Sequence, residues 1–137
     1  MAEALQQLQK YARRPRRSTA VHGLARELLD GSFVRASSEG EASFVESGGE
    51  RFSRACVVGT VVGNDAIAGV PAVEVLDGTG VLSCRAFDEK SARGLEGINK
   101  GEEVLVIGKL RETRERFLAV ECVRRLADPN WETVHLL

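Results

Sequence analysis

The sequence predicts a mostly β fold: a closed barrel of five strands, with a helical extension before it and a short helix after it. Three observations support this prediction. Apolar, β-branched runs of strand length recur through the second half of the chain, a Gly-rich turn joins two of them, and one short helical pattern interrupts the series. The chain has 137 residues, 43% of them hydrophobic and 28% charged, and a formal net charge of -1. Its composition is therefore that of a folded globular domain.

Residues 1–52 are expected to form a helical and loop extension that packs on the barrel. Within it, apolar side chains at helical spacing predict a short amphipathic helix over residues 2–12, and a basic segment follows at 13–17. A second helical pattern covers residues 21–29 and ends at an Asp-Gly pair, which is a typical helix stop. Residues 36–50 are rich in Ser, Gly and Glu, so we expect a loop there, anchored by one apolar Phe-Val pair.

Residues 53–126 are expected to form the barrel. Asp-Gly-Thr-Gly at 77–80 is a hairpin signal between the second and third strands, and residues 88–95 carry a short helical pattern. Gly59, inside the first strand, predicts a bulge or a sharp coil. Three strands, a helix and two strands follow each other in the order of a five-stranded Greek-key barrel, the OB-fold. The expected strands are 55–62, 72–76, 81–87, 103–111 and 117–123.

Alternation along the last three strands predicts which side chains fill the barrel. Leu105 and Ile107 face outward although they are apolar, so we expect another part of the chain, such as the N-terminal helices, to cover them. Phe117, Glu121 and Val123 are also expected to face outward. The residues expected to face inward are Leu82, Cys84, Ala86, Val104, Val106, Gly108, Leu110, Leu118, Val120 and Cys122.

The three cysteines, Cys56, Cys84 and Cys122, are too far apart in sequence for a zinc knuckle or a redox pair. Each lies in an apolar run, where a cysteine behaves as a small buried hydrophobe. We therefore expect unpaired thiols and a reducing, cytoplasmic location. His22 and His135 are isolated, and we expect them to have surface or packing roles.

Nothing in the sequence indicates catalysis. The motifs GxxxxGK[ST], HExxH and GxSxG are absent, and no cysteine is paired with a plausible base. No apolar run approaches the roughly 20 residues of a membrane span. We therefore expect a protein that is not an enzyme, holds no metal or cofactor and has no membrane partner.

Arg85 and Phe87 form the first candidate nucleic-acid-binding pair. Phe87 ends the third strand on the same face as Arg85, in the region where OB-folds present aromatic platforms to bases. An exposed aromatic ring can stack on any base, and a guanidinium beside it can stack or neutralise phosphate. The alternative is that Phe87 plugs the end of the barrel against the following helix.

The turn between the fourth and fifth strands is the second candidate region. Long basic side chains with an aromatic residue beside them suit a single-stranded phosphate backbone. The alternative is an ordinary solvated hairpin, because Glu112 and Glu115 alternate with the basic residues. The candidate residues are Lys109, Arg111, Arg114, Arg116 and Phe117.

Residues 127–137 are expected to begin a C-terminal oligomerisation helix. Asp128 and Pro129 provide a capping side chain and a proline in the first turn. So short a helix is marginal by itself, so we expect it either to dock on the barrel or to belong to a longer interface helix. The candidate partner-binding residues are Trp131, Val134 and Leu137.

Four segments carry a resemblance to a known family: ACVVGTVV, VEVLDGTGVLSCRAF, VLVIGKLRE and DPNWETVHLL. They resemble the middle, OB-fold subunit of replication protein A and its archaeal relatives. The region from Thr19 through GLARELLDGSFVR to Arg54 resembles the N-terminal region of archaeal replication-protein-A-associated subunits. Together these segments cover nearly the whole chain, and the combination of GKLR with DPNWE is more specific than the DGTG turn.

The resemblance implies single-stranded DNA binding in replication and repair, within a complex with larger OB-fold subunits that C-terminal helices hold together. In that family the aromatic residue that closes the third strand stacks on DNA, and Phe87 occupies its place. Lys109 and Arg111 match the GKLR segment. Glu121 is a departure, because the eukaryotic subunit presents a second stacking aromatic near this position, whereas an acid repels phosphate. The tail is another, because it stops at Leu137, where the family's helix would continue.

Three functions therefore stay open. The first is a non-catalytic subunit that binds single-stranded DNA by base stacking and phosphate neutralisation. The second is an assembly subunit with little DNA contact of its own, which Glu121, the near-neutral charge and the predicted helix with Trp131 favour. The third is an RNA- or tRNA-binding OB module, because a stacking platform does not distinguish the two sugars.

Overall fold

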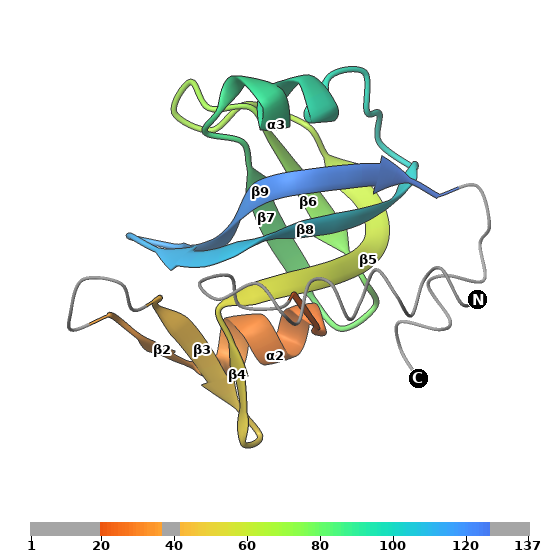
Figure 1. Ribbon diagram of the computed structural model, residues 1–137. Coiled ribbons are helices and arrows are strands. Elements are labelled where there is room, and N and C mark those ends of the chain that lie inside the picture. The colour runs from red at the N-terminus through yellow and green to blue at the C-terminus, as the bar shows by residue number, and fades with distance from the viewer. Residues whose placement is uncertain (1–19, 37–41, 127–137) are drawn as a thin grey trace, which may run out of the picture.

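The computed structural model describes residues 20–36 and 42–126 of the chain (Figure 1). Two helices and two β-sheets make up this part. In chain order the elements are β1 (Val21–His22), α2 (Ala25–Asp30), β2 (Ser32–Val34), β3 (Phe44–Ser47), β4 (Glu50–Phe52), β5 (Arg54–Gly63), β6 (Ala72–Leu76), β7 (Val81–Arg85), α3 (Glu89–Leu95), β8 (Glu103–Glu112) and β9 (Arg116–Arg125).

Strands β5 to β9 close into a barrel, which confirms the predicted mostly β OB-fold. Strand β5 pairs antiparallel with both β6 and β8, β6 pairs with β7, and β8 pairs with β9. A short parallel pairing of β7 with β9 completes the circle, with Cys84 opposite Leu118 and Arg85 opposite Ala119. This short pairing is called the β7–β9 seam below.

The interior of the barrel is apolar, as the alternation predicts. All but one of the residues expected to face inward are buried, and valines of β5, β6 and β8 complete the core. Gly59 lies where β5 turns from β8 toward β6, since the next residue, Thr60, pairs with both Leu76 and Glu103. A Cβ at Gly59 would collide with the carbonyl oxygen of Leu76, so only glycine permits this sharp coil.

Cys122 is the exception, because β9 contains a β-bulge. Cys122 pairs with Ile107 and Val120 with Gly108, so Glu121 is an extra residue of β9 that has no opposite residue on β8. The bulge reverses the alternation beyond it. The predictions for the two residues after Glu121 were therefore wrong: Cys122 is exposed, and Val123 packs against the core.

The expectation that all three cysteines are buried holds only in part. Cys84 is fully buried, and burial raises the pKa of its thiol to about 12. Cys56 is half-buried, and burial, with nearby Cys122 as the smaller cause, raises the pKa of its thiol to about 11. Both are therefore protonated and unreactive at neutral pH.

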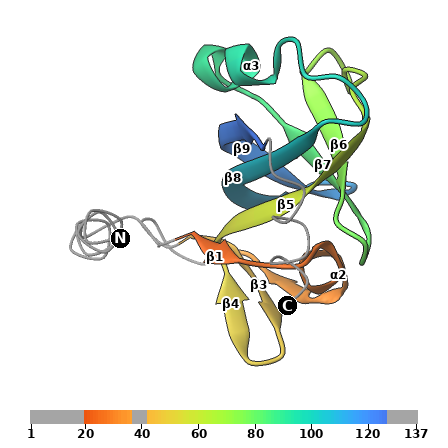
Figure 2. The same ribbon diagram turned by 90° about the vertical axis from the view of Figure 1, so that its right-hand side faces the viewer.

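The two helices lie at opposite ends of the barrel (Figures 1 and 2). Helix α3 brings buried Leu95 to the core. Helix α2 is held by the turn at 77–80: Ala25 N donates to Asp77 Oδ2 at 2.7 Å, and Arg26 N donates to Thr79 Oγ1 at 3.1 Å. The hairpin turn therefore supplies acceptors that an N-terminal cap usually provides locally.

The region before the barrel differs from its prediction in two places. The second helix begins at Ala25 rather than at residue 21, because Val21 and His22 pair in parallel with β5. The predicted loop at 36–50 contains β3 and the start of β4, which form a three-stranded sheet with β2. Val45 of β3 and Phe52 of β4 are completely buried in the core cluster. Their burial stabilises two strands that the polar composition of this segment did not predict.

Several predicted features lie outside the described residues. They include the helix over 2–12, the basic segment at 13–17, and the C-terminal helix with Trp131, Val134 and Leu137. Within the described part, Leu105 and Ile107 face outward as predicted and are half-buried. No helix in this part is long and apolar enough to cross a membrane.

Candidate nucleic-acid interface

A groove of about 490 Å³ lies on the outward face of β8 and β9, beside the end of β7 and the start of α3. It brings together four of the seven residues predicted to bind nucleic acid, namely Phe87, Lys109, Arg111 and Phe117. Its full lining is Phe87, Asp88, Lys109, Arg111, Phe117, Ala119, Val120 and Glu121. The groove therefore combines aromatic surface with both signs of charge.

Phe87 and Phe117 form an aromatic pair with unequal exposure. Their ring centroids are 5.6 Å apart, and the ring planes are inclined by 43°. Phe87 is 60% exposed, whereas Phe117 is 4% exposed. Phe117 does project outward from β9, as predicted, but Phe87 and the guanidinium of Arg85, 4.4 Å from the Phe117 ring centroid, lie against it. Phe87 thus offers its surface to solvent instead of plugging the barrel, and Phe117 supports it.

The guanidinium of Arg85 contacts Ser83, Glu115 and Phe117 in this structure. Its Nε donates to Ser83 Oγ at 3.2 Å, and its Nη2 lies 3.0 Å from Glu115 Oε2 in an ion pair. Only 12% of the Arg85 side chain is exposed, compared with 75% of Glu115. The predicted residue is therefore next to the aromatic pair, but a carboxylate already occupies its guanidinium.

Lys109, Arg111 and Arg114 are the exposed cations of the predicted set. Lys109 is opposite Ala119 and Arg111 is opposite Phe117 in the β8–β9 ladder, so both stand beside the aromatic pair. Arg114 lies in the turn between β8 and β9, outside the groove lining. None of the described carboxylates forms an ion pair with these three side chains.

Arg116, which is also among the predicted nucleic-acid-binding residues, is bound within the protein in this structure. Its Nη1 donates to the carbonyl oxygens of Leu28, Leu29 and Gly31 at 2.8, 2.9 and 2.5 Å. Its Nη2 reaches Glu112 at 3.4 Å, and 11% of the side chain is exposed. Arg116 therefore satisfies carbonyl groups that the C-terminal end of α2 leaves without helical partners.

Glu121 is paired within the protein. Arg54, at the start of β5, makes a two-pronged contact with it: Nε donates to Oε1 at 2.9 Å and Nη2 donates to Oε2 at 3.1 Å. Such forked pairs are the strong form of this interaction. Because the charge of Arg54 offsets that of Glu121, the carboxylate repels phosphate less than the sequence alone predicts. The role of Arg54 was not foreseen, because its partner is 67 residues away in sequence.

Asp88 also lines the groove, although it was not among the residues predicted to bind nucleic acid. Its carboxylate accepts a hydrogen bond from Ser91 N at 2.7 Å and another from Ser91 Oγ at 3.0 Å, so it caps helix α3. These two bonds, the backbone one first, hold the pKa of Asp88 below its ordinary value. The group is therefore ionised at neutral pH. The spacing Asp-x-x-Ser before a helical pattern was a usable signal for this cap.

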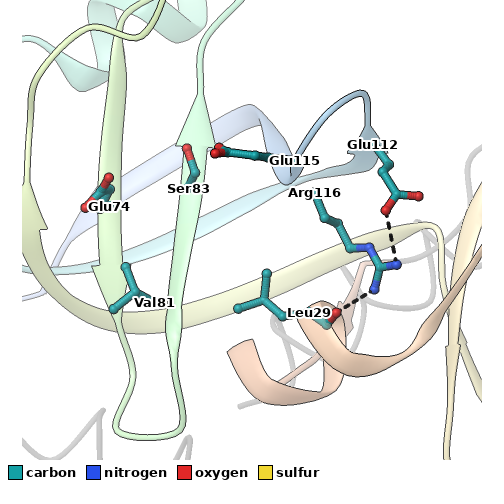
Figure 3. A pocket seen from close by; sticks show the side chains of 7 residues that line it. All are labelled: Leu29, Glu74, Val81, Ser83, Glu112, Glu115 and Arg116. Atoms are coloured by element: carbon teal, nitrogen blue, oxygen red, sulfur yellow. Dashed lines mark hydrogen bonds and ion pairs between the residues drawn. The ribbon is translucent and has the colours of Figure 1, made fainter.

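A second hollow, of about 450 Å³, lies on the outward face of β6 and β7, between the β8–β9 turn and α2 (Figure 3). Three of its seven lining residues are glutamates, of which Glu112 is paired with Arg116 and Glu115 with Arg85. It is called the acidic hollow below. Its lining residues are Leu29, Glu74, Val81, Ser83, Glu112, Glu115 and Arg116. The one cation in its lining, Arg116, is already bound, so the hollow is a poor site for phosphate.

Metal chemistry finds no support in the described part of the chain, where no three His, Cys, Asp or Glu side chains are grouped so as to hold an ion. The cations and aromatic rings of the groove instead suit an anionic, stackable ligand.

No protein-family profile and no curated protein matches the chain. Solved structures do match it. A chain of the S. pombe Stn1–Ten1 complex superposes with a TM-score of 0.74 at 22% identity and covers 87% of both chains. A chain of a replication protein A heterotrimer bound to single-stranded DNA gives a TM-score of 0.66 at 22% identity, covering 87% of this chain and 90% of that one. Yeast replication protein A bound to single-stranded DNA gives 0.65 at 18% identity, with 90% and 89% covered. At these identities the likeness establishes the fold alone, which is an OB-fold.

Proposed function

We propose that the chain is a non-catalytic subunit of a replication-protein-A-type complex and binds single-stranded DNA during replication and repair. One observation carries the proposal: exposed Phe87 shares a groove with the exposed cations Lys109 and Arg111. Stacking of a base on an aromatic side chain contributes about 1–3 kcal/mol whatever the base. The likeness to chains of replication protein A that are bound to single-stranded DNA supports the same ligand class.

The proposed mechanism uses one stacking platform. A base lies on Phe87, which Phe117 holds from the side of β9, and the adjoining phosphates meet Lys109 and Arg111. Arg114, at the turn, extends the positive surface along the strand. Asp88 carries a negative charge in the same groove, so we expect modest affinity for the chain by itself. The proposal includes a cytoplasmic, nucleoid-associated location and larger OB-fold subunits as partners.

The direct test is fluorescence anisotropy of labelled oligo-dT with wild type and Phe87→Ala. Loss of the platform should weaken binding about 5- to 150-fold, which corresponds to the stacking energy. Phe44→Ala is the matched control, because it removes a half-buried ring of the small sheet that does not line the groove, and it should bind like wild type. Failure of wild type to bind at low salt would refute direct DNA binding.

A second candidate function is an assembly subunit that makes little DNA contact. It is favoured by the occupied state of Arg85 and Arg116 and by the two acids, Asp88 and Glu121, that line the groove. The similar chains come from multi-subunit assemblies, a Stn1–Ten1 complex and a replication protein A heterotrimer.

The two functions separate in solution. An assembly subunit should form a stable complex with a larger OB-fold chain from the same genome, measured by light scattering on the full-length chain, and Phe87→Ala should leave that complex intact. Both functions predict such a complex, so binding of oligo-dT by the chain decides between them. A chain that joins the complex and also binds oligo-dT through Phe87 would support the first function, and one that joins it without binding oligo-dT would support the second. A chain that joins no such complex would refute the assembly role in both.

A further inference from the structure

The carboxylate of Glu115 forms an ion pair with the guanidinium of Arg85, which lies beside the aromatic pair of Phe87 and Phe117. Its Oε2 is 3.0 Å from Nη2 of Arg85, and the Arg85 guanidinium is also 4.4 Å from the Phe117 ring centroid. The burial of the two partners is unequal, because 12% of the Arg85 side chain and 75% of the Glu115 side chain is exposed. One end of the ion pair is therefore fixed against the barrel, and the other stands in solvent.

The surroundings allow Glu115 to leave without disturbing the fold. It lies in the turn between β8 and β9, where its carbonyl oxygen accepts a hydrogen bond from Thr113 N at 3.1 Å. That backbone contact shapes the turn independently of the carboxylate. Arg85 would keep its contacts with Ser83 and Phe117 if the carboxylate moved away. The pair can therefore open by rotation of one exposed side chain.

A carboxylate and a phosphate bind a guanidinium in the same way, through oxygens placed opposite its N–H groups. We propose that Glu115 is an internal anion that covers Arg85 in the ligand-free protein, and that a backbone phosphate of the single strand takes its place. This inference rests on the proposed function. It makes Glu115 a residue that sets the affinity of the groove, although Glu115 does not line it.

The acidic hollow favours the Glu115–Arg85 ion pair in the ligand-free protein. Glu115 lines that hollow together with Glu74 and Glu112, as Figure 3 shows. Glu112 is paired with Arg116, whereas Glu74 forms no ion pair with a described residue, so a carboxylate released from Arg85 loses its cation and keeps a like charge nearby. The ligand-free pairing is therefore favoured until a phosphate competes for Arg85. Phosphates of a strand that is already stacked on Phe87 compete at high local concentration, whereas a free anion does not.

The test is a double-mutant cycle measured by anisotropy with labelled oligo-dT. Glu115→Gln should tighten binding roughly two- to fivefold, the equivalent of one partly exposed ion pair. In an Arg85→Ala background the same substitution should change nothing, because no guanidinium remains to be released. Glu50→Gln, an exposed position at the start of β4, is the control with the same change in charge, and it should bind like wild type.

Each outcome decides a different question. Equal tightening by Glu115→Gln in both backgrounds would reduce the effect to general charge and overturn the inference, as would no tightening in either. Absence of binding by wild type and by all variants at low salt would instead refute the proposed function. If circular dichroism shows that Arg85→Ala is unfolded, Arg85→Gln replaces it in the cycle with the same expected outcomes.

Discussion

The guanidinium of Arg116 joins two regions that are far apart in the chain. It comes from the start of β9 and binds three carbonyl groups at the C-terminal end of α2, 85 to 88 residues earlier. Hydrogen bonds from a charged donor are worth more than neutral ones, and acceptors left unsatisfied in a buried place carry a penalty. We therefore assign Arg116 to stability.

Arg116→Ala should lower the free energy of unfolding by about 1–3 kcal/mol, because the carbonyl groups of α2 lose their donor. Arg114→Ala removes the same charge from an exposed position in the neighbouring turn and should change stability by less than about 0.5 kcal/mol. Urea denaturation followed by circular dichroism measures both. Similar losses in the two variants would show that charge, and not the carbonyl contacts, is what matters.

The sequence could identify the candidate site only where local pattern was enough. Phe87, at the end of an alternating strand, and Lys109 and Arg111, on the outward face of the next one, were predictable because alternation alone decides their exposure. The partners of Arg85 and Arg116 depend on how the β8–β9 turn meets β7 and α2. No local pattern contains that information.

At the scale of elements, helix α3 depends on its first capping residue. It has seven residues, too few to be stable as an isolated helix, and its N-terminal N–H groups need acceptors. Asp88 supplies one for Ser91 N. Because hydrogen bonds from Ser91 lower the pKa of Asp88 in the folded state, the ionised form stabilises the fold. This stabilisation is present above the ordinary aspartate pKa and is lost as the pH falls through the lowered value.

We therefore expect the Ser91 amide signal to be constant from neutral pH down to the ordinary aspartate range, near 3.8, and to shift toward its unfolded position below it. An NMR titration measures this. Asp88→Asn should remove the transition, and Glu89→Gln, which changes the next residue of the helix, should keep it. A Ser91 titration unchanged in Asp88→Asn would contradict the assignment of the cap.

The elements were predictable in proportion to their local signal. Strand β6 was predicted with its observed bounds, and β7 differs only at its end, because alternation and an Asp-Gly turn act together there. Strands β3 and β4 were missed, since they are three to four residues long and lie in a polar segment. The bulge at Glu121 was missed because it depends on pairing with β8.

At the scale of the molecule, the near-zero net charge conceals an uneven surface. Two exposed cations beside Phe87 face one side of the β7–β9 seam, and three glutamates line the acidic hollow on the other. Single-stranded DNA would thus follow β8 and β9, reach β7 at Arg85, and be repelled from the acidic hollow beyond it. The footprint on the described part of the chain should be short.

The seam itself has a mechanical consequence. The ladder between β5 and β8 joins residues 54–60 to β8, whereas only two residue pairs join β7 to β9. The contacts of Phe117 with Arg85 and Phe87 also cross the β7–β9 seam, so side chains of the proposed binding site help to hold β7 against β9.

Amides of β7 and the first half of β9 should therefore exchange with solvent faster than those of the β5–β8 ladder, and faster still in Phe117→Ala. Hydrogen exchange followed by NMR measures this, and uniform protection around the barrel would disprove it. Single-stranded DNA that contacts both Phe87 and Arg111 would cross the β7–β9 seam on the outside of the barrel, so bound DNA should slow hydrogen exchange at the seam. DNA binding would then be detectable as slower hydrogen exchange in the barrel itself.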